Sequence, residues 1–338
     1  MEKILNHIPV SVLDLAPILE GETAGDAFRN ARELAVALER FGYQRVWYAE
    51  HHNMANIASS ATAVLIGYIA GATSHIRVGS GGVMLPNHAP LIIAEQFGTL
   101  EALYPGRIDL GLGRAPGTDQ ATSMALRRGL GASVDHFPDD VVELKDFLSA
   151  HSEPSRVRAI PGEGSEVPVW LLGSSTYSAQ LAAMLGLPFA FASHFAPTHL
   201  EEALHLYRTR FTPSEQLSEP YVMACVNVIA SDTDKAAERL ATSFYQLALG
   251  IIRDERRPLQ PPADSMEGLW TEYEEAAVSH MMKYTYVGGP ARINQALEQF
   301  VTDTKVNELM VASYIYDLEA KIHSYELVSG CFRQQQAS

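Results

Sequence analysis

Eight short apolar runs recur along this 338-residue chain, and longer segments with apolar residues at three- and four-residue intervals lie between them. Such nearly continuous apolar strands, alternating with helices, indicate a parallel sheet that is buried on both faces. Eight strand–helix units predict an α/β protein with a closed (β/α)8 barrel. An open, doubly wound sheet is the alternative, because the same pattern produces both. The predicted strands cover residues 10–15, 45–49, 76–80, 107–112, 167–172, 189–193, 221–230 and 308–313, and the predicted helices cover residues 25–41, 61–73, 91–103, 177–185, 198–210 and 291–301.

Two segments interrupt this alternation. Residues 118–168, between predicted strands four and five, contain one helical stretch at 141–148. Residues 231–286 follow predicted strand seven and have a charged, proline-rich centre, RDERRPLQPPAD. We therefore expect one barrel domain over residues 1–338 with insertions after strands four and seven. The segment 231–286 would be a mobile lid over a substrate, or else a helical decoration or a subunit contact.

Charge and cysteine usage narrow the class of protein. The formal net charge is −15, which argues against nucleic acid as a partner. Cys225 and Cys331 are far apart and lack metal-ligand spacing, so we expect no disulfide framework and a reducing compartment. The first 15 residues do not resemble a signal peptide, and no run approaches the ~18 apolar residues of a membrane span. These features predict a cytoplasmic protein without a membrane partner.

Residues 76–119 contain two glycine-rich turns at successive strand ends. The carboxyl ends of barrel strands form one active face, so both turns would contribute to one site. The backbone at Ser80-Gly81-Gly82 can approach a planar ring closely, although glycine is also common in ordinary turns. Arg114 can bind a phosphate or carboxylate through paired hydrogen bonds, or be an ordinary surface arginine. Arg107, at the other end of that strand, is predicted to be structural.

A predicted phosphate site follows strand five, where GSSTYS at 173–178 opens a helix. Free backbone N–H groups, serine hydroxyls and the helix dipole favour an anion there, although serine is also an ordinary N-cap. A rival site is Gly288-Gly289-Pro290, since barrels also bind phosphate near strands seven and eight. That sequence is equally typical of a loop with proline in the first helical turn. The candidate phosphate-binding residues of the first site are Gly173, Ser174, Ser175 and Ser178.

Polar residues also end other predicted strands. His51 follows strand two and would face the barrel mouth, where an imidazole can transfer a proton. The adjacent His52 would point elsewhere, and no spacing completes a zinc site, so we expect no metal. Asp14 ends strand one and His194 ends strand six. Each would line a substrate pocket or cap a loop.

Several of these motifs together are similar to those of the bacterial luciferase-like flavin monooxygenases, along nearly the whole chain. The resemblance depends on the order and spacing of the motifs more than on any one of them. RAPGTD at 114–119 resembles a bacterial branch of the family that is distinct from the light-emitting subunits. The other matching motifs are EHH at 50–52, the glycine-rich turn followed by MLPNHAP at 84–90, LYPGRIDLGLGR at 103–114, LLGSSTYSAQLA at 171–182 and VGGP at 287–290.

The resemblance implies a luciferase-like (β/α)8 barrel that binds FMN at its C-terminal face. It maps a non-proline cis peptide bond onto Ser80-Gly81, phosphate contacts onto Arg114, Ser175 and Ser178, and a proton-transferring histidine onto His51. The long segment 231–286 matches the mobile loop of the family. Where the light-emitting subunit has a reactive cysteine, this chain has Gly113, so we do not expect the luminous aldehyde reaction.

The resemblance therefore predicts a monooxygenase that uses reduced FMN and O2 to oxygenate a small organic substrate. A separate flavin reductase would supply the reduced FMN, because no G-x-G-x-x-G fingerprint follows a predicted strand. By analogy with the family we expect a homodimer. The alternatives are hydride transfer with F420 or FMN on the same fold, and a non-catalytic flavin-binding protein.

Overall fold

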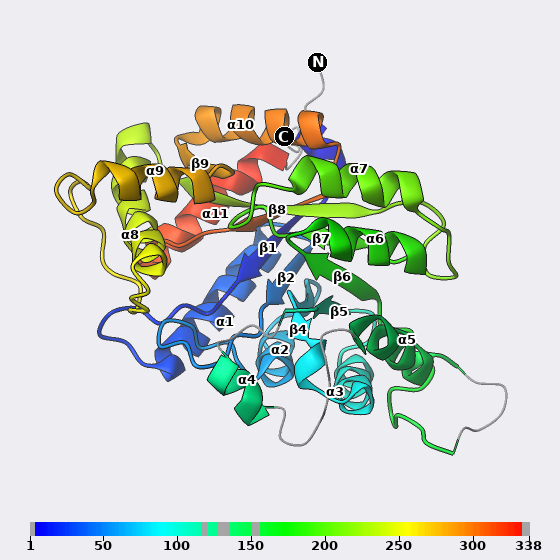
Figure 1. Cartoon of the computed structure of the whole chain (residues 1–338). Coiled ribbons are helices and arrows are strands. Elements are labelled where there is room, and N and C mark those ends of the chain that lie inside the picture. The colour runs from blue at the N-terminus through cyan, green and yellow to red at the C-terminus, as the bar shows by residue number, and fades with distance from the viewer. Residues whose placement is uncertain (1–3, 116–119, 127–135, 151–155, 333–338) are drawn as a thin grey trace.

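The computed structural model describes residues 4–115, 120–126, 136–150 and 156–332 (Figure 1). Within these residues, eight parallel strands form a closed barrel. The last strand pairs with the first, Val10 opposite Leu309, and also with its other neighbour, Glu308 opposite Met223. This double pairing closes the barrel and excludes the open sheet. Around the barrel the strands are β1 (Val10–Asp14), β2 (Arg45–Tyr48), β3 (Arg77–Ser80), β5 (Ile108–Gly113), β6 (Val169–Gly173), β7 (Phe189–Phe191), β8 (Val222–Ala230) and β10 (Glu308–Ala312).

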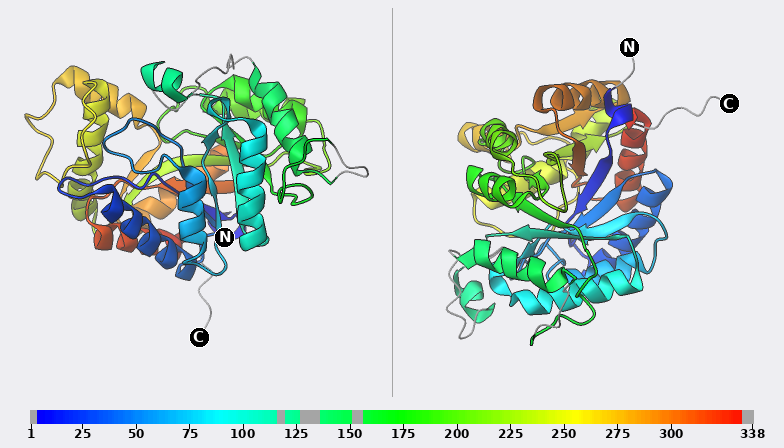
Figure 2. Two further views of the ribbon diagram at one scale, coloured as in Figure 1. Left: turned by 90° about the horizontal axis from the view of Figure 1, so that it is seen from below. Right: turned by 90° about the vertical axis from the view of Figure 1, so that its right-hand side faces the viewer.

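Helices surround the barrel on the outside, as the three views of the ribbon show (Figures 1 and 2). The six predicted helices and the stretch at 141–148 are confirmed. The helix α11, which was not predicted, buries Lys321, Ser324 and Ser329, so its inner face lacks the apolar periodicity of the others. The surrounding helices are α1 (Ala24–Arg40), α2 (Thr62–Ala70), α3 (Pro90–Leu103), α5 (Phe137–Leu148), α6 (Thr176–Leu185), α7 (Leu200–Arg210), α10 (Pro290–Thr304) and α11 (Leu318–Phe332).

Two short strands were not predicted. The strand β4 (Val83–Met84) pairs with β5 and follows β3 after a break at the two glycines. The strand β9 (Thr285–Gly288) pairs with the second half of β8, whose first half pairs with β10. Both strands are too short to leave an apolar run in the sequence.

The two interrupting segments carry helices of their own. The first contains α4 (Gln120–Leu126) and α5, and parts of it, with the predicted motif residues 116–119, lie outside the described residues. The segment 231–286 contains α8 (Asp234–Ile252) and α9 (Glu272–Met281), at the left in Figure 1. These helices form a small core with Ile229 and Ile315. Leu259, between them, exchanges two backbone hydrogen bonds of 2.9 Å with the loop after β1. The role of the segment as a lid remains a prediction.

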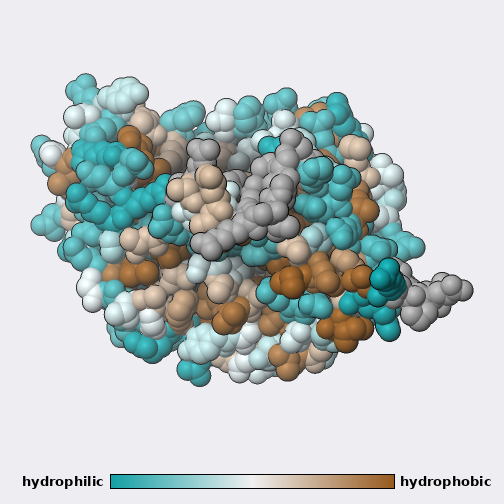
Figure 3. Space-filling model, turned by 60° about the horizontal axis from the view of Figure 1, so that its bottom comes forward, coloured by the Kyte–Doolittle hydropathy of each residue, from teal (hydrophilic) through white to brown (hydrophobic). Residues whose placement is uncertain are grey.

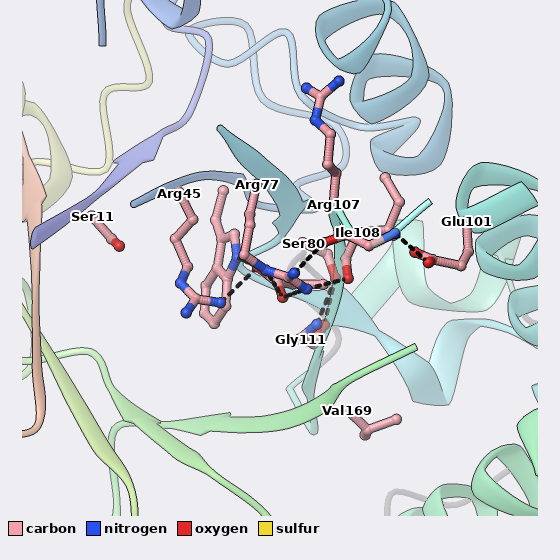
Figure 4. A network of polar contacts seen from close by, with 12 residues as sticks. Ser11, Arg45, Arg77, Ser80, Glu101, Arg107, Ile108, Gly111 and Val169 are labelled. Carbon is pink, nitrogen blue, oxygen red and sulfur yellow. Dashed lines mark hydrogen bonds and ion pairs between the residues drawn. The ribbon is translucent and has the colours of Figure 1, made fainter. Parts of the chain in front are cut away.

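A buried ionic layer fills the N-terminal end of the barrel interior (Figure 4). The Arg45 guanidinium donates to Asp109 at 2.7 Å and to Glu308 at 2.8 and 3.1 Å. Arg77 donates to the other oxygen of Asp109 at 2.9 and 2.6 Å. Burial opposes the charge of Arg45, but the two carboxylates hold its pKa above the usual value. The layer thus joins β2, β3, β5 and β10 from inside.

Arg107, predicted to be structural, lies outside this layer. Its guanidinium donates to the carbonyl oxygens of Ala70 at 3.2 Å, Thr73 at 2.9 Å and Ile76 at 3.1 Å. These bonds join the end of α2 to the strands that flank it.

Among the helices of the described residues, none is long and apolar enough to cross a membrane.

We expect Asp109→Ala to lower the free energy of unfolding by about 3–5 kcal/mol, because it leaves Arg45 and Arg77 buried without their shared carboxylate. Urea denaturation of the purified variant measures the loss. Asp264→Ala is the control, since Asp264 is almost fully exposed and its pair with Arg239, at 3.5 Å, lies on the surface. Equal losses in the two variants would contradict this account of the ionic layer.

Candidate active site

An aromatic layer lies above the ionic layer and closes the barrel interior. The rings of Trp47 and Trp170 meet edge to face with their centroids 5.2 Å apart, and Trp170 meets Tyr221 in the same way at 5.6 Å. Six smaller apolar residues complete the layer: Leu13, Ala190, Met223, Cys225, Met310 and Ala312. Because the interior is filled below, a ligand site inside the barrel has to lie above this layer, at the carboxyl ends of the strands.

The turn between β3 and β4 lies at this face. Gly81 is required there, because a side-chain Cβ would lie 2.9 Å from Leu13 Cδ1 and 3.1 Å from Trp47 Cβ. The Ser80 hydroxyl donates to the Gly111 carbonyl at 2.8 Å and accepts from the Gly111 N–H at 2.9 Å. The fully buried Ser80 side chain therefore joins β3 to β5, and only the backbone of this turn is left to face a ligand.

The non-proline cis peptide bond lies between Gly81 and Gly82, which corrects its predicted position at Ser80-Gly81. Ser80 still pairs opposite Tyr48, so β3 continues through this residue. The strand therefore breaks one peptide later than the sequence motif indicated.

Glu50 organises the neighbouring rim in a way that the sequence interpretation missed. Its carboxylate lies 2.8 Å from His52 Nε2 and 2.9 Å from His88 Nε2, and it accepts from the Met84 N–H at 3.0 Å and the Asn87 amide at 3.2 Å. Its own N–H donates to the Gly82 carbonyl at 3.1 Å. Glu50 thus fixes the glycine turn from both sides. These residues all belong to the EHH and MLPNHAP motifs, but their spacing in the sequence does not show that Glu50, His52 and His88 meet.

The electrostatics of this cluster favour an ionised Glu50. Burial by itself would raise the pKa of the Glu50 carboxyl. The hydrogen bond and charge of His88, then the bonds from His52 and the Met84 N–H, outweigh burial and hold that pKa below its usual value. His52 therefore belongs to this cluster. Among the described residues, no group of three or more His, Cys, Asp or Glu side chains could hold a metal ion.

His51 and His194 follow strands on opposite sides of the barrel. His51 follows β2 and His194 follows β7, and three barrel strands separate β2 from β7 in either direction. The buried His194 has its pKa lowered to about 3, first by burial and then by the charge of His51. A charge on one histidine is therefore felt by the other across the mouth, and His194 is neutral at ordinary pH.

Arg114 lies against the first turn of α6. Its guanidinium carbon is 4.0 Å from the centroid of the Tyr177 ring. The N-cap residue Ser175 makes no side-chain hydrogen bond to the helix, so the first N–H groups of α6 keep no such partner. Ser178 is buried against Gly173, where a Cβ would lie 2.5 Å from that of Ser178. The arrangement places a cation beside a helix N-terminus, which favours an anion. Ser174 lies between Gly173 and Ser175, half-buried in the same turn.

Two other candidates do not join this group. The Gly289 N–H, in the rival phosphate site, donates to the Asp234 carboxylate at 2.6 Å. A carboxylate of the chain thus occupies the N-terminus of α10. Asp14 forms a buried ion pair with Lys321 of α11 at 2.8 Å. It lies on the helix side of β1 with Val10 and Val12, not with the inward-facing Leu13, which corrects its prediction as a pocket residue.

Comparison with known proteins agrees with this geometry. The sequence profile described as luciferase-like monooxygenase matches residues 8–308. The chain belongs to this family. It is 54% identical over 320 residues to a luciferase-like monooxygenase of Escherichia coli K12, covering 95% of this chain and 96% of that protein. It is 34% identical to an N-acetyl-S-alkylcysteine monooxygenase of Bacillus subtilis, covering 95% and 97%.

Solved structures share the barrel. The apo structure of MsnO8 superposes with a TM-score of 0.86 at 34% identity, covering 96% of this chain and 98% of that one. A type II Baeyer–Villiger monooxygenase of Pseudomonas putida in complex with FMN gives a TM-score of 0.71 at 18% identity. An F420-dependent secondary alcohol dehydrogenase gives 0.69 at 17%. At these lower identities the likeness concerns the fold alone, and both cofactors occur on it.

The low pKa of His194 predicts a pH-dependent stability. Between about pH 3 and pH 6.5, the unfolded chain binds a proton at this residue that the folded chain does not bind. The folded state therefore loses stability as the pH falls through this range. We expect the stability advantage of the wild type over His194→Gln to shrink from pH 7 to pH 4.5, as measured by urea denaturation at each pH. If the difference in free energy of unfolding between the wild type and His194→Gln stayed constant over this pH range, the pKa of His194 would not be lowered by folding.

Proposed function

We propose that this protein is a flavin-dependent monooxygenase that uses reduced FMN and O2 to oxygenate a small organic substrate. The observation that carries the proposal is the position of Arg114 over the first turn of α6, where Ser175 leaves the helix N–H groups without a side-chain cap. This is a site for one phosphate group. The glycine turn after β3, on the same face, offers a backbone surface for a ring.

Each group in the mouth has a role in this proposal. Arg114, Ser175 and Ser178, with the backbone at Gly173 and Ser174, bind the phosphate through charge and hydrogen bonds. The turn at Ser80-Gly81-Gly82 supports the ring, and the Glu50 cluster keeps that turn in place. His51 holds or transfers a proton beside the ring. When bound, reduced flavin supplies the electrons that activate O2. A flavin reductase, as a separate transient partner, provides the reduced cofactor.

The substrate is a small organic molecule, and N-acylated thioethers are the first class to test. This choice follows from the 34% identical relative named for N-acetyl-S-alkylcysteine. Cys225 does not take part in the chemistry, because burial raises the pKa of its thiol well above the usual value. A neutral, buried thiol is a poor nucleophile.

The decisive experiment combines cofactor binding with turnover. We expect the wild type to bind FMN more tightly than riboflavin, which lacks the phosphate, and Arg114→Ala to lower FMN affinity by roughly tenfold or more while leaving riboflavin affinity unchanged. Flavin fluorescence titration measures both affinities. Arg210→Ala, an exposed arginine at the end of α7, serves as the control.

Turnover is then measured with FMN, NADH and a flavin reductase over a panel of thioethers. Oxygen uptake that yields an oxygenated product, and not only hydrogen peroxide, supports the monooxygenase. Binding of F420 with hydride transfer and no oxygen uptake would instead establish the alternative function. Flavin binding without turnover of any added compound would point to the non-catalytic alternative.

We also propose that the chain forms a homodimer through α2 and α3. Both helices carry large apolar side chains at the surface: Val64 is 74% exposed, Tyr68 44%, Ile92 45% and Leu103 63%. Hydrophobic patches are visible on the face that bears these helices (Figure 3). Exposed apolar side chains on two neighbouring helices are a feature of subunit interfaces. We expect sedimentation equilibrium to give a dimer, and Val64→Glu with Ile92→Glu to give a monomer. A monomeric wild type would exclude this interface.

A further inference from the structure

Asn227 of β8 presents an amide to the mouth of the barrel. Inward-facing residues alternate along this strand, with Met223 and Cys225 in the aromatic layer, so Asn227 lies one step above that layer. Its Nδ2 donates to the His194 carbonyl at 2.6 Å and to Thr285 Oγ1 at 3.1 Å. These two bonds fix the orientation of the amide. Its Oδ1 is buried, and among the described residues it has no hydrogen-bond partner.

His194, whose backbone carbonyl accepts from Asn227, carries a second buried polar atom on its side chain. Its Nδ1 has no hydrogen-bond partner in the described part of the chain. The ring is held in place by edge contact with Phe195, at 4.8 Å between centroids. Since buried polar atoms without partners destabilise a protein, two of them on residues joined by a 2.6 Å bond point to a ligand that supplies the partners.

We propose that Asn227 Oδ1 and His194 Nδ1 form a subsite that binds an uncharged group of the substrate, with an N–H donor next to an acceptor, as in a secondary amide. Oδ1 only accepts hydrogen bonds, so the ligand must donate one to it. The neutral imidazole of His194 donates to or accepts from the adjoining atom, according to its tautomer.

Charge selects against ionised groups at this position. A carboxylate cannot donate to Oδ1, and its charge would be buried without a cation. An ammonium group would be buried against a carbonyl-type oxygen and an imidazole with no carboxylate to balance it. The amide loses less hydration energy than either ion, so we infer that it is the preferred class.

The position of the subsite assigns it to the substrate and not to the cofactor. In the proposed function, on which this inference rests, the phosphate and ring occupy the ends of β3, β5 and β6. The ends of β7 and β8 form the wall that remains, opposite the end of β2, which His51 follows. A substrate held there would lie between the ring support and the subsite.

Three probes that share a thioether test the proposal: N-[2-(methylthio)ethyl]acetamide, 2-(methylthio)ethylamine and 3-(methylthio)propionate. They differ in whether the polar end is neutral, cationic or anionic. Calorimetric titration of the protein, with and without FMN, should show the amide binding at least tenfold more tightly than the two ions. His194→Phe and Asn227→Leu should each lose this preference, whereas His194→Gln, which keeps a neutral hydrogen-bonding group, should retain it.

His199→Phe is the matched control, because His199 is exposed at the start of α7. Absence of amide binding, or equal affinity for the three probes, would overturn the proposal. If His194→Phe bound FMN more weakly but kept the preference for the amide probe, His194 would contact the flavin ring and not the substrate. That result would also overturn the proposal. Failure of the wild type to bind FMN would instead reject the proposed function, while the probe preference in the FMN-free protein would still decide the subsite.

Discussion

The interior of the barrel depends on one buried cation. Arg45 joins Asp109 of β5 to Glu308 of β10, two strands that do not pair with each other, and Arg77 shares the first of these carboxylates. The lower barrel therefore contains two arginines and two carboxylates, whose charges balance. The tryptophans stack on this layer, with the Arg45 guanidinium 5.0 Å from the Trp170 ring. The residues at the carboxyl ends of the strands therefore rest on two packed layers, and such support holds the side chains of a binding site in position.

The polar groups above the tryptophans lie on two sides of the barrel mouth. The side formed by β3, β5 and β6 has a cation, helix N–H groups that no side chain caps, and a tightly packed backbone turn. The side formed by β7 and β8 has a neutral histidine and an amide. This difference in charge suits a cofactor with a phosphate on one side and an uncharged organic group on the other. The Glu50 cluster serves the first side by fixing a turn, without needing to touch a ligand.

The sequence predicted the elements that leave a periodic trace and missed those that depend on tertiary contacts. All eight barrel strands were predicted because each is an apolar run. The helix α11 was missed because Lys321 interrupts its inner face in order to pair with Asp14, 307 positions away. The same contact explains the misplacement of Asp14, since the side of a strand on which a residue lies depends on register. Glu50 and His88 meet through a fold that brings the ends of β2 and β4 together, which no local pattern records.

One consequence follows from the Asp234 carboxylate at the N-terminus of α10. Many barrels hold phosphate near this position, and this chain offers the same Gly-Gly-Pro backbone there. Asp234 fills this position, because its carboxylate already accepts the Gly289 N–H and has Arg292 beside it at 3.9 Å. In the proposed function, Arg114 and the start of α6 are then the phosphate site that remains among the candidates within the described residues. In the proposed function, a ligand with one phosphate would therefore bind at the start of α6 and not at the start of α10, so Asp234 would influence where the ligand binds without contacting it.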